Sequence, residues 1–207
     1  AALANRVRHA KEFGITVGDV QFDYGTAMKR SRAVSQQNSK GVEFLMKKNK
    51  VTYLKGSGKL VAARTLAVTT ADGKTEKHDA KKAIVLATGS RVRGLPQVGL
   101  ALNKTTVLSS DEVLVLEQAP TTMAVIGAGA VGCEFADVFN AFGTKVTLVE
   151  VAPQILPLED ADSSAEVMKA FRKRGIDVRV GAKLGDVQVG PDSVSMTIEA
   201  NGEKTAL

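Results

Sequence analysis

Apolar residues recur at helical spacing in the first part of the chain. Four of them come first: Leu3, Val7, Ala10 and Phe13. They predict a helix that ends at Gly14, because glycine commonly follows the last helical turn. A second helix is predicted from about Thr26 to Lys48. Its apolar side carries Val34, Val42, Leu45 and Met46.

The pattern then changes to the alternation that is typical of strands. Val51 to Leu54 predicts a short strand. An alternating segment around Leu66 reaches a turn at Asp72-Gly73, and the polar stretch from Lys74 to Asp79 predicts an exposed returning strand. Together these segments predict a small β-meander.

An unbroken apolar run from Ala83 to Ala87 predicts a strand buried on both faces, which stops at Thr88-Gly89-Ser90. Residues 91–119 have weak periodicity and predict a connection. Beyond Pro120, strands and helices alternate. The predicted strands are Met123–Ile126, Lys145–Val149 and Ile176–Val180, and the predicted helices are Val131–Phe142 and Ser163–Arg174. This alternation predicts a parallel, doubly wound sheet.

The two ends of the sequence look interrupted. A strand pattern from Ser193 to Ile198 is followed by Asn201-Gly202, a dipeptide typical of hairpin turns, and few residues follow for a return strand. At the other end, Ala1 stands directly before a helical pattern. We therefore expect the sequence to be the interior of a longer protein.

One segment carries specific chemistry: Ala124-Val125-Ile126-Gly127-Ala128-Gly129-Ala130-Val131-Gly132-Cys133-Glu134. It places Gly-x-Gly-x-x-Gly between a predicted strand and a predicted helix, as in a dinucleotide-binding turn. Gly127 would permit the tight turn, Gly129 would let the backbone approach a pyrophosphate, and Gly132 would allow close packing of helix on strand. The pyrophosphate would lie on free N–H groups at the positive end of the helix.

Glu150 ends the next predicted strand, where this fingerprint expects an acid. A carboxylate accepts hydrogen bonds from the ribose hydroxyls of NAD and repels the additional phosphate of NADP. No Lys or Arg follows directly, the next residues being Val151, Ala152 and Pro153. The sequence therefore favours NAD over NADP.

Composition narrows the other possibilities. The chain has 28 Lys and Arg against 22 Asp and Glu, but its basic residues are scattered and only 4% of its residues are aromatic, so nucleic-acid binding is a distant alternative. No apolar stretch is long enough to span a membrane. The single cysteine, Cys133, fits a reducing compartment and a packing role. Neither His9 nor His78 has a partner in the sequence that would indicate a metal site.

These segments together resemble the class I flavin disulfide reductases, or flavin pyridine nucleotide–disulfide oxidoreductases, and among them the enzymes that oxidise dihydrolipoamide with NAD⁺. The resemblance covers nearly the whole chain. The similar stretches are Lys48-Asn49-Lys50-Val51 leading to Gly56-Ser57-Gly58, Thr88-Gly89-Ser90, Gly127 to Glu134, Gly143 to Glu150 and Gln154-Ile155-Leu156-Pro157.

The resemblance implies an α/β fold with two nested Rossmann-like domains for FAD and NAD, both incomplete. Residues 1–93 would belong to the FAD-binding domain, residues 94–119 to a connection and residues 120–207 to a truncated NAD-binding domain. Residues near FAD would be Gly56, Gly58, Thr88, Gly89 and Ser90. Residues near NAD would be Gly127, Ala128, Gly129, Ala130, Val131, Gly132, Cys133, Glu134 and Glu150, with Leu184 at the adenine end. Glu134 would stand near the nicotinamide and flavin, or would act only as an acid at a helix start.

The resemblance also implies an activity for the whole protein. Two electrons would pass from a lipoyl group, carried by a protein, through a protein disulfide and FAD to NAD⁺. The whole protein would be a homodimer in the bacterial cytoplasm or mitochondrial matrix, serving a 2-oxo acid dehydrogenase complex. The family's CxxxxC pair, first GxGxxG and His–Glu pair are missing from these residues, so we expect no catalytic residue and no disulfide turnover in them alone. NADPH-dependent disulfide or mercuric reductases and a non-catalytic NAD-binding module are the alternatives.

Overall fold

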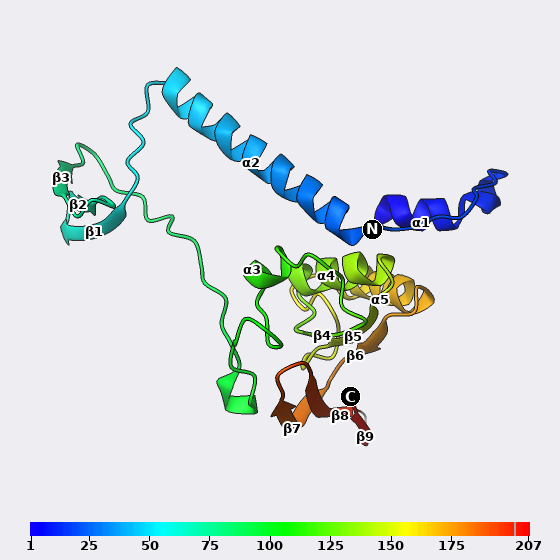
Figure 1. The fold of residues 1–207 in the computed structure, drawn as a ribbon. Coiled ribbons are helices and arrows are strands. Elements are labelled where there is room, and N and C mark those ends of the chain that lie inside the picture. The colour runs from blue at the N-terminus through cyan, green and yellow to red at the C-terminus, as the bar shows by residue number, and fades with distance from the viewer. Residues whose placement is uncertain (201) are drawn as a thin grey trace. The chain divides into compact units, whose positions relative to one another are not determined.

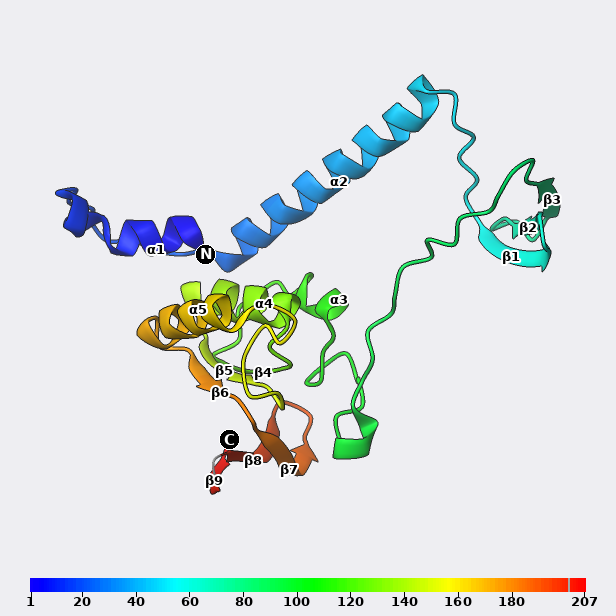
Figure 2. The ribbon, with the colours of Figure 1, turned by 180° about the vertical axis from the view of Figure 1, so that it is seen from behind.

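A computed structural model describes residues 1–200 and 202–207. These residues form two compact units, one made by Ala1–Lys29 together with Val92–Leu207 and the other by Arg30–Arg91. Figure 1 shows the course of the chain, and Figure 2 shows it from behind. Among the described residues, the first unit contains two three-stranded sheets and the second contains one.

The first predicted helix is confirmed, but it changes from an α-helix to a 3₁₀-helix after Arg8. It consists of α1 (Ala2–Arg8) and the short 3₁₀-helix η1 (Ala10–Phe13), which ends at Gly14 with a φ of 72°. This positive φ belongs to the left-handed region that glycine adopts without steric cost.

The second predicted helix is α2 (Tyr24–Lys48), which begins in the first unit and continues into the second. Asp23 lies directly before it and accepts hydrogen bonds from the N–H and Oγ1 of Thr26, at 3.0 and 2.6 Å. Lys47 and Lys48 lie in its last turn, where positive charge favours the helix dipole. Its predicted apolar side is not covered: Val34, Val42 and Leu45 are between 43% and 53% exposed.

The predicted β-meander is confirmed in the second unit for its second and third strands, whereas its first strand is Ser57–Ala62 and not the predicted Val51–Leu54. The strands β1 (Ser57–Ala62), β2 (Thr65–Thr69) and β3 (Thr75–Asp79) form one antiparallel sheet in chain order. Ala67 and Val68 of β2 are buried, whereas β1 is exposed along its whole length. The middle strand therefore holds the small core of this unit.

Two strand predictions in the second unit are wrong. Val51 to Leu54 and Ala83 to Ala87 form no strand, and Val85 and Leu86 are 85% and 73% exposed. A strand buried on both faces needs hydrogen-bonded neighbours in a sheet. No described strand pairs with either segment. Apart from half-buried Ile84, the residues of these two segments are therefore exposed.

The predicted parallel sheet is confirmed in the first unit. The strands β4 (Thr122–Ile126), β5 (Lys145–Val149) and β6 (Asp177–Arg179) pair in parallel and in that order. Thr122 pairs with Lys145, and Thr147 pairs with Asp177, so each pair spans an intervening helix. The parallel order brings the carboxyl ends of the strands to one edge of the sheet.

The intervening helices are α4 (Ala130–Ala141) and α5 (Ala161–Lys173), which both views show along the same side of the sheet (Figures 1 and 2). They bury one apolar cluster against it. The fully buried members of this cluster include Phe139, Val146, Leu148 and Ile155. Burial of each such side chain contributes about 1.5–3 kcal/mol. This core fixes the position of the β4–α4 turn.

A second sheet in this unit is antiparallel and consists of β7 (Lys183–Val189), β8 (Val194–Ala200) and β9 (Glu203–Ala206). β8 confirms the last strand pattern, whereas β7 was not predicted. The predicted hairpin turn includes Asn201, which lies outside the described residues. Buried Met196 and Ile198 of β8 pack with Val149 at the end of β5. The antiparallel sheet therefore adjoins the carboxyl end of the parallel one.

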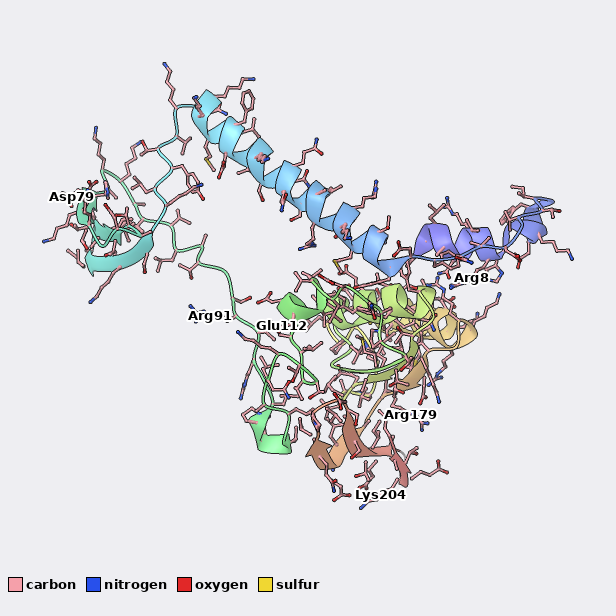
Figure 3. The ribbon with its side chains drawn as sticks, viewed as in Figure 1. Arg8, Asp79, Arg91, Glu112, Arg179 and Lys204 are labelled. Atoms are coloured by element: carbon pink, nitrogen blue, oxygen red, sulfur yellow. The ribbon has the colours of Figure 1, made fainter. Side chains whose placement is uncertain are left out.

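The connection before β4 is largely irregular, as predicted. It contains the 3₁₀-helix η2 (Pro96–Val98) and the single turn α3 (Ser110–Val113). Glu112, labelled in Figure 3, accepts hydrogen bonds from the N–H and hydroxyl of Ser109 at the start of α3. Among the helices of residues 1–200 and 202–207, none has the length and apolar character needed to cross a bilayer.

Candidate nucleotide-binding site

The glycine-rich segment forms a tight turn between β4 and α4. Gly127 has a φ of 102°, and its N–H donates to the carbonyl of Val149 on β5 at 2.8 Å. This bond extends the parallel ladder by one residue, after which the left-handed conformation of Gly127 turns the chain away from the sheet. Gly129 then precedes the first residue of α4 in an ordinary extended conformation, with φ −68° and ψ −179°.

Gly129 and Gly132 need the absence of a side chain for different reasons. A Cβ on Gly132 would lie 1.9 Å from the carbonyl oxygen of Gly127, so only glycine lets α4 pack on the turn. A Cβ on Gly129 would meet nothing within 4 Å. The structure of the chain therefore gives no packing reason for glycine at 129, and this open space can receive a ligand.

The start of α4 has the properties of an anion site. Cys133 makes the first helical bond, its N–H donating to the carbonyl of Gly129 at 3.0 Å. The N–H groups of the preceding turn, Ala130 to Gly132, lie before that bond and point out of the helix end. Gly129, Ala130 and Val131 are exposed, and the first turn holds no acidic residue. Unpaired N–H groups and the helix dipole together favour a phosphate.

Glu150 is buried at the end of β5, and its carboxylate holds two loops. Oε2 accepts the N–H of Ala128 in the glycine turn at 2.7 Å, and Oε1 accepts the N–H of Ala152 at 2.9 Å. Each carboxylate oxygen retains lone-pair capacity for a ribose hydroxyl. Within residues 1–200 and 202–207, no cation forms an ion pair with Glu150.

Arg179 stands on the neighbouring strand, where its backbone carbonyl accepts the N–H of Glu150 at 2.8 Å (Figure 3). Its guanidinium pairs with Asp177, whose two carboxylate oxygens accept from Nε at 2.8 and 3.0 Å, and the described residues show no ion pair between Arg179 and Glu150. A free arginine here would favour the additional phosphate of NADP. The Asp177 carboxylate offsets the positive charge of Arg179, and this pairing favours NAD over NADP.

Ala128 and Cys133 lie inside the turn rather than on its surface. Ala128 is fully buried, and its carbonyl accepts the N–H of Leu156 at 2.7 Å and the Sγ–H of Cys133 at 3.4 Å. Burial, followed by the charge of Glu150, raises the pKa of the Cys133 thiol from 9.0 to about 11. These two residues contribute to the shape of the turn.

We expect Cys133 to resist alkylation in the folded chain. Because the thiolate is the reactive form and the pKa of the thiol is raised to about 11, the native thiol stays protonated at pH 8. Iodoacetamide should react with it about a hundredfold more slowly than with the urea-unfolded chain, as measured by mass spectrometry over time. Equal rates in the folded and unfolded chains would contradict the buried, protonated thiol.

The remaining residues predicted for the NAD site lie at its margins. Glu134 is exposed on α4, beyond the first turn. Leu184 is half-buried on β7 and packs against the apolar cluster that contains Val149 and Ala182. Leu184 therefore lies in the same unit as the glycine turn, close to the carboxyl end of β5.

The residues predicted to approach FAD belong to the second unit. A Cβ on Gly56 would lie 2.5 Å from the carbonyl oxygen of Thr69, so the meander itself requires glycine there. Gly58 pairs with Val68 on β2, and a Cβ on Gly58 would lie 3.5 Å from the side chain of Leu66, an ordinary contact. Thr88, Gly89 and Ser90 are exposed and form neither helix nor strand, and Gly89 has a φ of 72°. Their open backbone can be approached by a ligand.

Sequence reasoning missed one buried polar residue near the turn. Ser164 of α5 is 1% exposed, and its hydroxyl donates to the carbonyl of Ile155 at 2.7 Å. Serine near the start of a helix is ordinarily a surface or capping residue, so no local signal distinguished it. In the part of the chain that the structure describes, no cluster of His, Cys, Asp and Glu could hold a metal ion.

Comparisons with known proteins show which proteins this chain is similar to. Residues 2–207 match the family model described as pyridine nucleotide-disulphide oxidoreductase. A dihydrolipoyl dehydrogenase of Chlorobaculum parvum is 38% identical over 204 residues, covering 99% of this chain and 43% of the relative. One of Mycobacterium tuberculosis is 41% identical over 195 residues, covering 94% and 41%. This chain therefore spans less than half the length of these relatives.

Solved structures of other proteins are also similar to this chain. The crystal structure of LpdA from Mycobacterium tuberculosis superposes with a TM-score of 0.84 at 26% identity, covering 99% of this chain and 44% of that one. The HOCl-induced flavoprotein disulfide reductase RclA from Escherichia coli has a TM-score of 0.65 at 22% identity, covering 98% and 43%. At that identity, the similarity to RclA shows the fold alone.

Proposed function

This chain belongs to the pyridine nucleotide-disulphide oxidoreductase family, and we propose that it forms the NAD-binding part of a dihydrolipoyl dehydrogenase. The observation that carries the proposal is the combination of three features at one sheet edge. They are the open space beside Gly129, the free N–H groups at the start of α4 and the buried carboxylate of Glu150. A dinucleotide presents a pyrophosphate and ribose hydroxyls, which these groups match.

Each group has a distinct task in the proposed site. The first turn of α4 would bind the pyrophosphate, and glycine at 129 would let the phosphate oxygens reach the backbone. The lone pairs that remain on Glu150 would accept the ribose hydroxyls. Leu184, on the adjoining antiparallel sheet, would contact the adenine end, and the exposed Glu134 would face the nicotinamide end.

We also propose that the whole protein uses FAD, with residues 1–93 supplying part of its site. The exposed backbone at Thr88, Gly89 and Ser90 fits such a contact, and the packing of Gly56 within the meander explains that glycine without a ligand. When bound, FAD would take electrons from a dithiol and deliver a hydride to NAD⁺. The described residues hold no pair of cysteines for the disulfide step.

The substrate and setting of the whole protein rest on its relatives. Several are named dihydrolipoyl dehydrogenase and come from bacteria, which supports a lipoyl substrate. We further propose a bacterial cytoplasmic location and a homodimer that serves a 2-oxo acid dehydrogenase complex. Within the same family, an NADPH-dependent disulfide reductase is the alternative. The environment of Glu150 and the pairing of Arg179 with Asp177 favour the NAD-dependent enzyme.

The purified chain should bind NADH at least about tenfold more tightly than NADPH, because a buried carboxylate faces the position of the additional phosphate. Fluorescence titration of the two nucleotides measures this ratio. AMP and its 2′-phosphorylated form are a matched pair that differ only in that phosphate, and they should show the same preference as competitors. Preference for NADPH would overturn the NAD assignment, and binding of neither nucleotide would overturn the site.

A further inference from the structure

Besides the carboxylate of Glu150, one peptide group of the loop between β5 and α5 contacts the glycine turn. This group joins Ile155 to Leu156, and both of its polar atoms are bonded. Its carbonyl oxygen accepts the Ser164 hydroxyl at 2.7 Å, and its N–H donates to the carbonyl of Ala128 at 2.7 Å. A trans peptide is planar, and its C=O and N–H point in opposite directions. The Ser164 hydroxyl therefore determines where the Leu156 N–H points.

The acceptor of that N–H belongs to a second peptide group, which joins Ala128 to Gly129. Because the Ala128 carbonyl points toward Leu156 and Cys133, the N–H of Gly129 points the opposite way. The Gly129 N–H makes no hydrogen bond to any described residue, and a Cβ on Gly129 would meet open space. The two peptide groups thus connect Ser164 to a free donor on the ligand side of the turn.

Leu156 is held in a conformation that it does not favour. Its φ is 49°, in the left-handed region that residues with a side chain rarely adopt. Such a conformation persists when surrounding contacts hold it. Those contacts include the Ser164 hydroxyl on the preceding carbonyl and the full burial of the Ile155 side chain. The backbone of Leu156 also donates to the Ala128 carbonyl and accepts the N–H of Glu159 at 2.9 Å. Removal of the hydroxyl takes away the side-chain hydrogen bond on the preceding carbonyl, and a relaxation of Leu156 toward a negative φ would then rotate the peptide group.

We propose that Ser164 is a positioning residue of the nucleotide site, which fixes the Gly129 N–H toward the pyrophosphate through the Ile155–Leu156 and Ala128–Gly129 peptide groups. This inference rests on the proposed function, because the pyrophosphate is the anion that the Gly129 N–H would meet. Ser164 itself touches no ligand. Its side chain is buried between α5 and the loop that follows β5.

Ser164→Ala should weaken NADH binding about tenfold, a factor equal to about 1.4 kcal/mol. The matched control is Ser163→Ala, which removes an exposed hydroxyl bonded to Asp160 at 2.8 Å, on the same helix. It should leave the Kd for NADH within twofold of wild type. NADH titration and thermal unfolding are measured for each variant, so that a change in affinity is separated from a change in stability.

A second comparison tests the route through Leu156. Glycine adopts a positive φ without steric cost, so the Leu156→Gly chain does not need the Ser164 hydroxyl to hold that conformation. Ser164→Ala should therefore change the Kd for NADH much less in the Leu156→Gly chain than in wild type. If Ser164→Ala does not fold, Ser164→Cys, which fills the same space and donates weakly, replaces it and should weaken binding as well.

Two results would overturn the inference. One is a Ser164 variant that lowers the unfolding temperature and leaves the Kd for NADH unchanged, which would assign Ser164 a structural role only. The other is an equal loss of affinity in the wild-type and Leu156→Gly backgrounds, which would exclude the peptide route. Failure of the wild-type chain to bind NADH would instead overturn the proposed function, and the inference with it.

Discussion

Gly132→Ala is expected to disrupt the turn and the stability of the first unit together. The added Cβ would lie 1.9 Å from the carbonyl oxygen of Gly127. Because this oxygen belongs to the backbone, no side-chain rotation can remove the clash. Either α4 must move away from β4 or the turn must open. Overpacking of this kind costs about 1–3 kcal/mol and at times more, and we expect a loss at the upper end of that range. Urea unfolding of the two chains measures the difference.

Gly132→Ala should also abolish NADH binding at concentrations that saturate wild type, because the N–H groups of the turn would no longer converge. Gly18→Ala is the control for a glycine substitution as such, since a Cβ on Gly18 would meet nothing within 4 Å and its φ is not in the left-handed region. A Gly132→Ala chain with wild-type stability would show that α4 does not pack on the turn as described.

Gly129→Ala should weaken NADH binding as well, but without the loss of stability. The φ of −68° suits alanine, and the Cβ would enter open space, so the free energy of unfolding should stay within about 0.5 kcal/mol of wild type. The same Cβ would stand where the pyrophosphate has to approach the start of α4. The affinity for NADH should fall at least about a hundredfold, which corresponds to about 2.7 kcal/mol.

The measurement is NADH titration beside urea unfolding, on Gly129→Ala and wild type in the same buffer. Unchanged affinity would place the ligand elsewhere and remove the strongest support for the dinucleotide site. A large loss of stability would instead show that Gly129 is required by the fold. The two glycines together therefore separate the contribution of the turn to folding from its contribution to binding.

The parallel half of the first unit could be predicted from the sequence because its signals are local. Strand β4, the glycine turn, helix α4 and strand β5 each carry their own pattern, and Gly175 marks the end of α5. The left-handed φ of Gly127 and the tight contact at Gly132 follow directly from the spacing of the glycines. Such features need no knowledge of distant residues.

Strand β7 and the two false strands show where local patterns are insufficient. In β7, Asp186 has a φ of 48°, and the register shifts between Gly185 and Gln188, which interrupts the alternation that a strand pattern requires. Ala83 to Ala87 shows the opposite case, a strand pattern without a strand. Its composition suits a buried strand, but the described residues offer it no partner strand. Strand formation depends on neighbours that the pattern itself does not contain.

The contacts behind the candidate site could not be predicted for a related reason. The sequence placed Glu150 near a ribose, but not its bonds to the N–H groups of Ala128 and Ala152. Likewise, no pattern around Ser164 predicts the hydrogen bond from its hydroxyl to the carbonyl of Ile155. These partners are brought together only when the β5–α5 loop folds beneath the glycine turn.

The two sheets of the first unit also differ in how quickly they can assemble. The antiparallel sheet joins near neighbours, such as Ala200 and Glu203, and hairpins of this kind close in about 1–10 μs. The parallel sheet joins Thr122 to Lys145 only after a whole helix has been placed, which is slower. The glycine turn joins β4 to α4 and therefore belongs to the parallel part of the unit, which assembles later. A nucleotide that binds there meets a nearly finished unit, so it should slow unfolding and leave the rate of folding unchanged.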